Sequence, residues 1–158
     1  MSDNEEITAL LGEAVRLELN IGRLYVRFHQ SLPDDSAFWW QLAMEEKNHA
    51  SLLRSADQIA PVVHDFPAGL LPEQLQEIRE LNARIEARIV AETAAPSTRS
   101  AAFGFALELE QSSGELHFQT FMETVSTGQL SRIFQSLNRG DMDHAQRLRT
   151  YMQERGIG

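Results

Sequence analysis

Apolar residues recur along this chain at the three- and four-residue spacing of a helix. No segment alternates between apolar and polar residues with the period of two that is typical of a half-buried strand. The clearest helical pattern lies in residues 73–93, where charged residues separate Leu75, Ile78, Leu81, Ile85 and Ile89. The pattern predicts an all-α protein without a sheet.

The chain is predicted to form five helices, and prolines separate the first four of them, because an uninterrupted helix is hard to continue through a proline. Pro33 ends the first, Pro61, Pro67 and Pro72 separate the second from the third, and Pro96 ends the third. The first predicted helix begins at residues 2–5, which have capping-box spacing, and ends at about Gln30. The second runs from after Asp35 to about Ile59, and the third covers residues 73–93. The fourth runs from Ser97 to about Val125, and the fifth runs from Thr127 or Gly128 to about Gln153.

Two segments of the chain repeat with a nearly constant offset. Residues 14–25 match residues 106–117, with every matched position 92 residues apart, and residues 46–54 match residues 141–149 at an offset of 95. The first match runs from an Ala-x-x-Leu-Glu sequence through a glycine and a leucine. The repeat predicts one domain, residues 1–158, built from a helical hairpin used twice, with residues 61–96 as the crossover between the hairpins.

Ionisable residues occupy positions on the apolar faces of the repeated helices. Glu46 and His49 are three residues apart, so they lie one above the other on one helix face whose other residues are mostly apolar. Glu18, Glu110 and Asp141 also have mostly apolar neighbours at helical spacing, and His144 follows Asp141 as His49 follows Glu46. A solvated acidic face with hydrogen-bonded core histidines explains either pair alone. Both pairs at matched positions of a repeat favour a site.

Four carboxylates aimed into one core would repel one another and lose their hydration, unless something compensates their charge. Two divalent cations would do so, because four carboxylates neutralise two such ions and two neutral imidazoles complete the ligand set. The chain has no cysteine, which excludes thiolate ligands and disulfides. Oxygen and imidazole ligands suit iron or manganese.

At these residues the sequence resembles the ferritin-like di-iron carboxylate proteins, especially their rubrerythrin-like branch. In that family a four-helix bundle takes one glutamate from each of two helices and a Glu-x-x-His motif from each of the other two. The resemblance covers nearly the whole chain and implies a ferritin-like bundle of two hairpins related by a pseudo-two-fold axis. It implies that Glu18 and His49 bind one ion, that Glu110 and His144 bind the other, and that Glu46 and Asp141 bridge the ions. The family resemblance also implies two iron ions per chain, with manganese or a mixed pair as the alternatives.

The chain departs from the family pattern at several positions. Asp141 stands where the family usually has a glutamate, and Ser113 stands where rubrerythrins place an additional glutamate. The sequence has no cysteine, so we expect it to lack the cysteine-bound iron domain of rubrerythrins. Lys47 occupies the position of the haem-ligating methionine of bacterioferritins, so no haem is expected.

Residues around the expected ligands provide three further expectations. Tyr25 and His117 each follow a ligand carboxylate by seven residues, and we assign them to hydrogen bonds or redox roles beside the metals, although such side chains also simply fill a core. Glu45 is expected to support a histidine of the first half, whereas Gly140, its counterpart in the second half, has no side chain to do so. The ion of the second half is therefore expected to bind more weakly.

Three functions are compatible with such a centre. The first is an oxidoreductase that reacts with peroxide or dioxygen and receives electrons from an external donor. The second is iron oxidation and storage in a ferritin-like assembly. The third is a structural or partner-binding bundle, in which the amphipathic helix 73–93 forms the interaction surface. We expect a homodimer or a larger homo-oligomer.

Charge and hydropathy limit the remaining partners and the location. With 14 basic and 23 acidic residues the net charge is −9, which disfavours binding to a nucleic-acid backbone and suits cations. The first residues are acidic, and no apolar run approaches the roughly 18 residues needed to span a bilayer. We expect a cytoplasmic protein that does not contact membranes.

Overall fold

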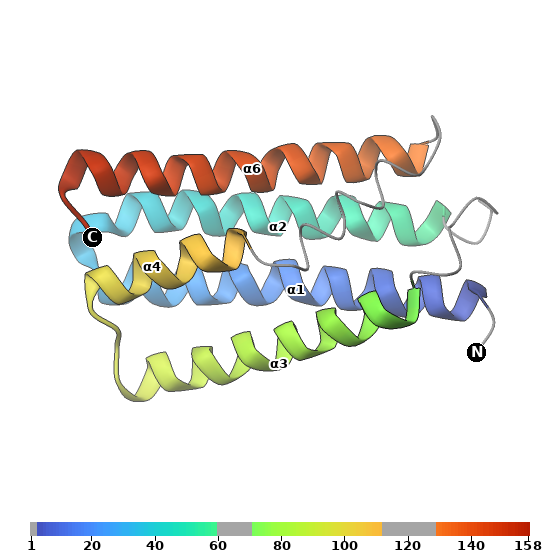
Figure 1. The fold of residues 1–158 in the computed structure, drawn as a ribbon, viewed down its shortest axis with the longest axis horizontal. Coiled ribbons are helices and arrows are strands. Elements are labelled where there is room, and N and C mark those ends of the chain that lie inside the picture. The colour runs from blue at the N-terminus through green and yellow to red at the C-terminus, as the bar shows by residue number, and fades with distance from the viewer. Residues whose placement is uncertain (1–2, 60–70, 112–128) are drawn as a thin grey trace.

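The structure is a computed structural model that describes residues 3–59, 71–111 and 129–158, all of whose regular elements are helical (Figure 1). In the last helix, side chains are described at Arg139 and from Asp143 onward. The elements are α1 (Asp3–Ser31), the 3-10 turn η1 (Pro33–Asp35), α2 (Ser36–Ile59), α3 (Leu71–Ala94), α4 (Arg99–Glu110) and α6 (Gln129–Arg155). The all-α prediction is confirmed for the described residues.

Helix ends lie close to the positions that the sequence signals predicted. Pro33 begins the short turn η1 between α1 and α2, where the chain reverses direction. Thr98 caps α4, because its side-chain oxygen accepts a hydrogen bond from the N–H of Ala101 at 3.2 Å. The second half of the helix predicted over 97–125 lies outside the described residues.

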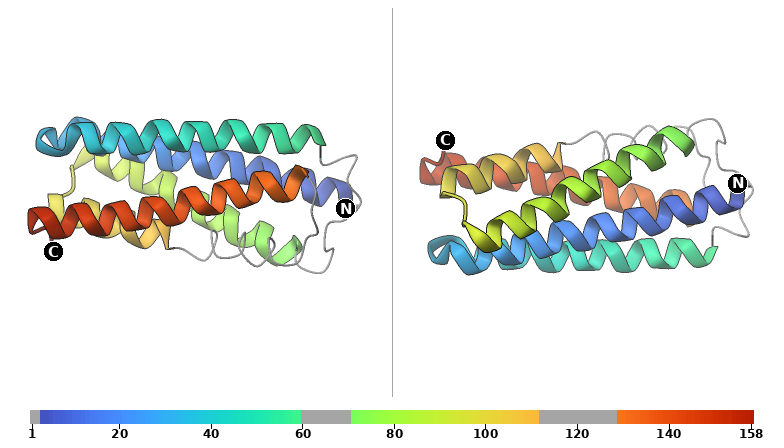
Figure 2. Two further views of the ribbon diagram at one scale, coloured as in Figure 1. Left: turned by 90° about the horizontal axis from the view of Figure 1, so that it is seen from above. Right: turned by 90° about the horizontal axis from the view of Figure 1, so that it is seen from below.

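α1, α2, α4 and α6 lie side by side, and α3 packs on α1 (Figures 1 and 2). α1 packs on α2, α2 on α6, and α4 on α6. α3 returns along the length of the other helices, so that α4 runs in the same direction as α2 (Figure 1). Such a return within the crossover is what the two-hairpin prediction required.

The apolar face of α3 is covered by α1 of its own chain. Leu75, Ile78 and Ile85 are buried, and α3 and α1 pack along their lengths. Asn20 donates a hydrogen bond to the buried Asn82 at 3.1 Å, and this polar contact fixes how the two helices lie against each other. The face that we considered as a partner surface is therefore used inside the chain.

None of the helices among residues 3–59, 71–111 and 129–158 is long and apolar enough to cross a membrane. Their apolar residues lie on one face, toward the neighbouring helices, with charged residues between them. This distribution agrees with the amphipathic pattern of the sequence.

A buried aspartate connects three elements at the end of the bundle where η1 lies. Both oxygens of Asp35 accept hydrogen bonds at 2.7 Å from Arg99, the first residue of α4. The hydroxyl of Tyr151 on α6 donates to the same carboxylate at 2.8 Å. Asp35 is only 1% exposed, so these three bonds compensate for its lost hydration.

We predict that Asp35→Asn lowers the free energy of unfolding by about 2–3 kcal/mol at pH 7, because it leaves Arg99 without its partner. Burial alone would raise the pKa of Asp35, but hydrogen bonds from Arg99 and Tyr151 hold it below the usual 3.8. A lowered pKa stabilises the folded state above the unfolded pKa, and this contribution is lost as the pH falls through the folded pKa. The difference between the proteins should therefore shrink below about pH 3.8.

Urea unfolding of both proteins between pH 3 and pH 7 would measure this difference. Asp34→Asn is the matched control, since Asp34 is the exposed neighbour in the same turn. Equal stability losses in the two variants would contradict the role assigned to Asp35.

Candidate metal centre

α1 and α2 bring three of the expected ligands together because the two helices approach closely at Gly22. A Cβ atom at Gly22 would lie 3.4 Å from the carbonyl oxygen of Ala43 and 3.6 Å from Cβ of Glu46. A larger side chain there would displace α2 at the position of Glu46. Close helix packing is therefore the observed reason for this glycine.

The first group of ligands joins Glu18 of α1 with Glu46 and His49 of α2. Nδ1 of His49 lies 3.3 Å from Oε2 of Glu18 and 3.3 Å from Oε2 of Glu46. Glu18 and Glu46 are 4% and 0% exposed, and His49 is 9% exposed. One nitrogen and two carboxylate oxygens therefore face one another in the core.

The second group joins Glu46 with residues of the other hairpin. Nδ1 of His144, on α6, lies 2.8 Å from Oε1 of Glu46 and 3.5 Å from Oε1 of Glu110, the last residue of α4. Both His144 and Glu110 are buried. This group repeats the composition of the first, with one imidazole and two carboxylates.

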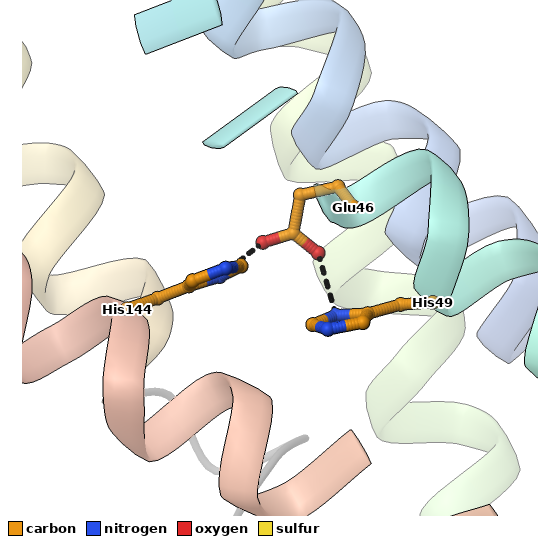
Figure 3. A group of neighbouring side chains, drawn as sticks. All are labelled: Glu46, His49 and His144. Carbon is orange, nitrogen blue, oxygen red and sulfur yellow. Dashed lines mark ion pairs between the residues drawn. The ribbon is translucent and has the colours of Figure 1, made fainter. Parts of the chain in front are cut away.

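Glu46 lies between the two histidines and belongs to both groups (Figure 3). One of its oxygens faces each imidazole, and the rings of His49 and His144 are 5.3 Å apart and inclined by 22°. Ligand atoms of Glu46, His49 and His144 all lie within 4.8 Å of one another. Glu46 therefore lies between the two groups and contacts a histidine of each.

Within the described part of the chain, several nitrogen and oxygen atoms of this cluster lack hydrogen-bond partners and are spaced as metal ligands are. Among the described residues, neither oxygen of Glu46 has a hydrogen-bond partner, and the same holds for Oε2 of Glu18, Oε2 of Glu110 and Nδ1 of His144. The separations of 2.8–3.5 Å are close to the roughly 3 Å expected between neighbouring ligands that each lie about 2.1 Å from one ion. The residues present thus fit a divalent cation in each group.

Protons carry the positive charge of the cluster in the metal-free protein. Burial, reinforced by the nearby Glu46 carboxylate, raises the pKa of Glu18 to about 8. Burial alone would lower the pKa of His49, but Glu18 and Glu46 raise it to about 10. For His144, Glu110 and Glu46 likewise overcome the effect of burial and raise the pKa to about 11. Near pH 7 a metal ion must therefore displace protons from these groups.

Tyr25 lies beside the buried cluster of glutamates and histidines. Its hydroxyl donates a hydrogen bond to Oε1 of Glu110 at 2.6 Å, and its ring is fully buried. Trp39 packs on that ring, with the centroids 5.3 Å apart. Tyr25 therefore fixes the orientation of a carboxylate ligand from the opposite hairpin.

Two of the expected site residues are not placed by the described part of the chain. Asp141 lies on α6, one turn before His144, but its side chain is outside the described residues. His117 is also outside them. Bridging by Asp141 and a hydrogen-bonding or redox role for His117 remain predictions.

Glu45 contacts the histidine of the other hairpin. Oε2 of Glu45 lies 3.9 Å from Nε2 of His144, and Arg147 donates to both Glu45 oxygens at 2.7 and 2.9 Å. Glu45 is turned by about 100° from Glu46 on α2, which directs it toward α6. We expected Glu45 to support a histidine of the first half, and the ion pair found here is with His144 of the second half.

Sequence reasoning missed Arg147, which holds Glu45 and also bonds Asp143 at 3.1 Å. The available signal was its position: Arg147 follows His144 by three residues and therefore lies on the same side of α6. Helix spacing cannot say which residue of α2 such an arginine meets.

Comparison with known proteins returned no match, whether against family models, curated proteins or solved structures. The arrangement of the five described ligand residues therefore provides the basis for a functional assignment.

We predict that His49 and His144 remain protonated at pH 8 in metal-free protein, since the adjacent carboxylates raise their pKa values to about 10 and 11. For a raised pKa, the stabilising contribution is complete below the unfolded value of 6.5 and is lost as the pH rises through the folded value. Imidazole nitrogen NMR between pH 5 and pH 11 measures the pKa values, and urea unfolding over the same range measures the stability.

His49→Gln and His144→Gln each assign one resonance in that experiment. Glu46→Gln should lower both pKa values, because it removes the carboxylate that faces both rings. Titration of both rings near pH 6.5 would contradict the ion pairs.

Proposed function

We propose that this chain is a non-haem di-iron protein, with manganese as the alternative metal, that reacts with peroxide or dioxygen. The observation that carries the proposal is Glu46, which lies between two matched groups of one imidazole and one further carboxylate in the core. Two redox-active ions held there would bind and reduce a small oxidant. An external donor would return the electrons, because the chain has no cysteine to hold an iron–sulfur or thiolate centre.

The arrangement of the helices supports assignment to the ferritin-like type. Glu18 comes from α1, Glu46 and His49 from α2, Glu110 from α4 and His144 from α6. That distribution, together with the return of the chain along α3, follows the family pattern to which the sequence is similar. Asp141 would complete it as the carboxylate of the second Glu-x-x-His-like pair.

Each described residue of the centre has a separate task in this proposal. Glu18 and Glu110 would each bind one ion, and Glu46 would bind both. Tyr25 holds the Glu110 carboxylate through its hydroxyl and keeps a proton within 2.6 Å of that oxygen. The apolar side chains around the cluster restrict water, which strengthens the interactions between ligands and ions.

We predict about two iron or manganese ions per chain after anaerobic reconstitution, one for each ligand group. The double variant His49→Ala/His144→Ala should retain neither ion, because it removes the nitrogen ligand from each group. Elemental analysis after gel filtration measures the metal content. His29→Ala is the matched control, since His29 lies on α1 outside the cluster and bonds Ser36.

The same reconstituted protein can distinguish the proposed activities. Stopped-flow mixing of the di-ferrous protein with peroxide or dioxygen should show rapid oxidation, with a peroxide preference for a rubrerythrin-like activity. A large hollow assembly that accumulates iron would instead support storage. Undiminished metal in the double histidine variant would refute the proposed centre.

We predict that Glu45→Gln weakens the ion bound by Glu110 and His144 by about tenfold, since loss of a residue supporting a ligand histidine typically costs 10–100-fold in affinity. The sequence-based expectation instead assigned Glu45 to a histidine of the first half. Metal titration in a His49→Ala background should show the loss, and titration in a His144→Ala background should not.

Asp143→Asn controls for an effect through Arg147, because Asp143 also accepts a hydrogen bond from Arg147 and is exposed. If Glu45→Gln lowered the metal affinity equally in the His49→Ala and His144→Ala backgrounds, Glu45 would not act specifically on the ion bound by His144.

A further inference from the structure

A pocket of about 380 Å³ lies between α1 and α2 and extends to the metal-binding cluster. Its apolar wall includes Leu19 and Val26 of α1, Met44 of α2 and Ile89 of α3. Glu18, one of the proposed ligands, forms part of the same wall. This volume is within the range of small-molecule sites, which are typically concave and mostly apolar.

Three cationic residues also line this pocket: Arg23, Arg27 and Lys47. None of them makes an ion pair with a carboxylate in the described part of the chain. Their recorded side-chain hydrogen bonds are to neutral amides, from Arg23 to Asn20 at 3.1 Å and from Arg27 to Gln30 at 3.4 Å.

This concentration of cations is unusual for the chain, whose net charge is −9. A hydrogen bond from Asn20 and the guanidinium of Arg16, whose Nε and Nη2 donate to Glu86, lower the pKa of Glu86, and Arg23 adds a smaller effect. The exposed guanidinium of Arg23 and that of Arg27 therefore remain able to pair with a ligand. A planar guanidinium suits a carboxylate because it donates two parallel hydrogen bonds.

We propose that this pocket binds an amphipathic organic monocarboxylate, with its carboxylate at Arg23 and Arg27 and its apolar chain against the wall that reaches Glu18. Arg23 and Arg27 lie further along α1 than Glu18, so a carboxylate bound by these arginines places the apolar end of the ligand toward the cluster. The apolar wall residues bury that chain, and the cations select the charge.

Gly22 lines the pocket between Glu18 and Val26 on the same face of α1. The ligand would thus lie on the Glu18 side of the centre, where it also excludes water from that side. Only this last consequence rests on the proposed metal function, because the binding of the ligand requires no metal.

Isothermal titration of the full chain with octanoate tests the site, in metal-free and in metal-loaded protein. We expect saturable binding with one octanoate per chain in both forms. Octylammonium, which has the same chain and the opposite charge, should not bind at this site, and 1-octanol should bind more weakly. If metal fails to bind but octanoate binds as expected, the proposed metal function is refuted and the pocket assignment stands.

Two pairs of matched variants locate the binding. Arg23→Gln/Arg27→Gln should reduce octanoate affinity by about tenfold or more, since it removes charge-assisted hydrogen bonds. Arg54→Gln, a change of an exposed α2 cation outside the pocket lining, should leave the affinity unchanged. Val26→Trp should abolish binding by filling the pocket, whereas Val90→Trp, at a 71% exposed position of α3, should not.

Circular dichroism and thermal unfolding check that each variant is folded. Absence of saturable octanoate binding in the unmodified chain would overturn the proposal. Equal affinity in Arg23→Gln/Arg27→Gln and Arg54→Gln would also overturn it. Light scattering measures the oligomeric state of the same samples. If the chain is a dimer that does not bind octanoate, and only the dissociated monomer binds it, then a second copy of the chain occupies the pocket and the proposal is also overturned.

Discussion

The fold depends on how five ionisable side chains can be buried together. Glu18, Glu46, His49, Glu110 and His144 lie in the core, where an unpaired charge loses hydration worth several kcal/mol. The structure reduces that cost by placing each imidazole between two carboxylates, with Glu46 shared. The hairpins must therefore keep their relative positions, because sliding either one would separate a histidine from its carboxylates.

Other contacts hold the hairpins in these positions from outside the cluster. At one end of the bundle, Asp35 connects the turn between α1 and α2 to α4 and α6. Along its side, the Asn20–Asn82 contact fixes α3 on α1. These polar contacts have directional geometry, so they specify one arrangement where apolar packing alone would allow several.

Much of this organisation could be predicted from periodicity and from the internal repeat. Both locate the helices. They also show that Glu18, Glu46 and His144 each lie on the apolar face of their own helix, because side-chain direction follows from spacing along one helix. Contacts between helices do not follow from such spacing. For this reason neither the contact of Glu45 with His144 nor the part played by Arg147 was foreseen.

The shared position of Glu46 has a consequence for how two ions would bind if the proposed centre forms. One residue of α2 directs an oxygen to each group, so the two binding equilibria would be thermodynamically linked. A first ion would release protons from its histidine and orient the carboxylate, so the second would bind to a ligand that is already ordered. Electrostatic repulsion between the two cations would oppose that gain. The occupancy of one site would therefore change the affinity of the other through a single side chain.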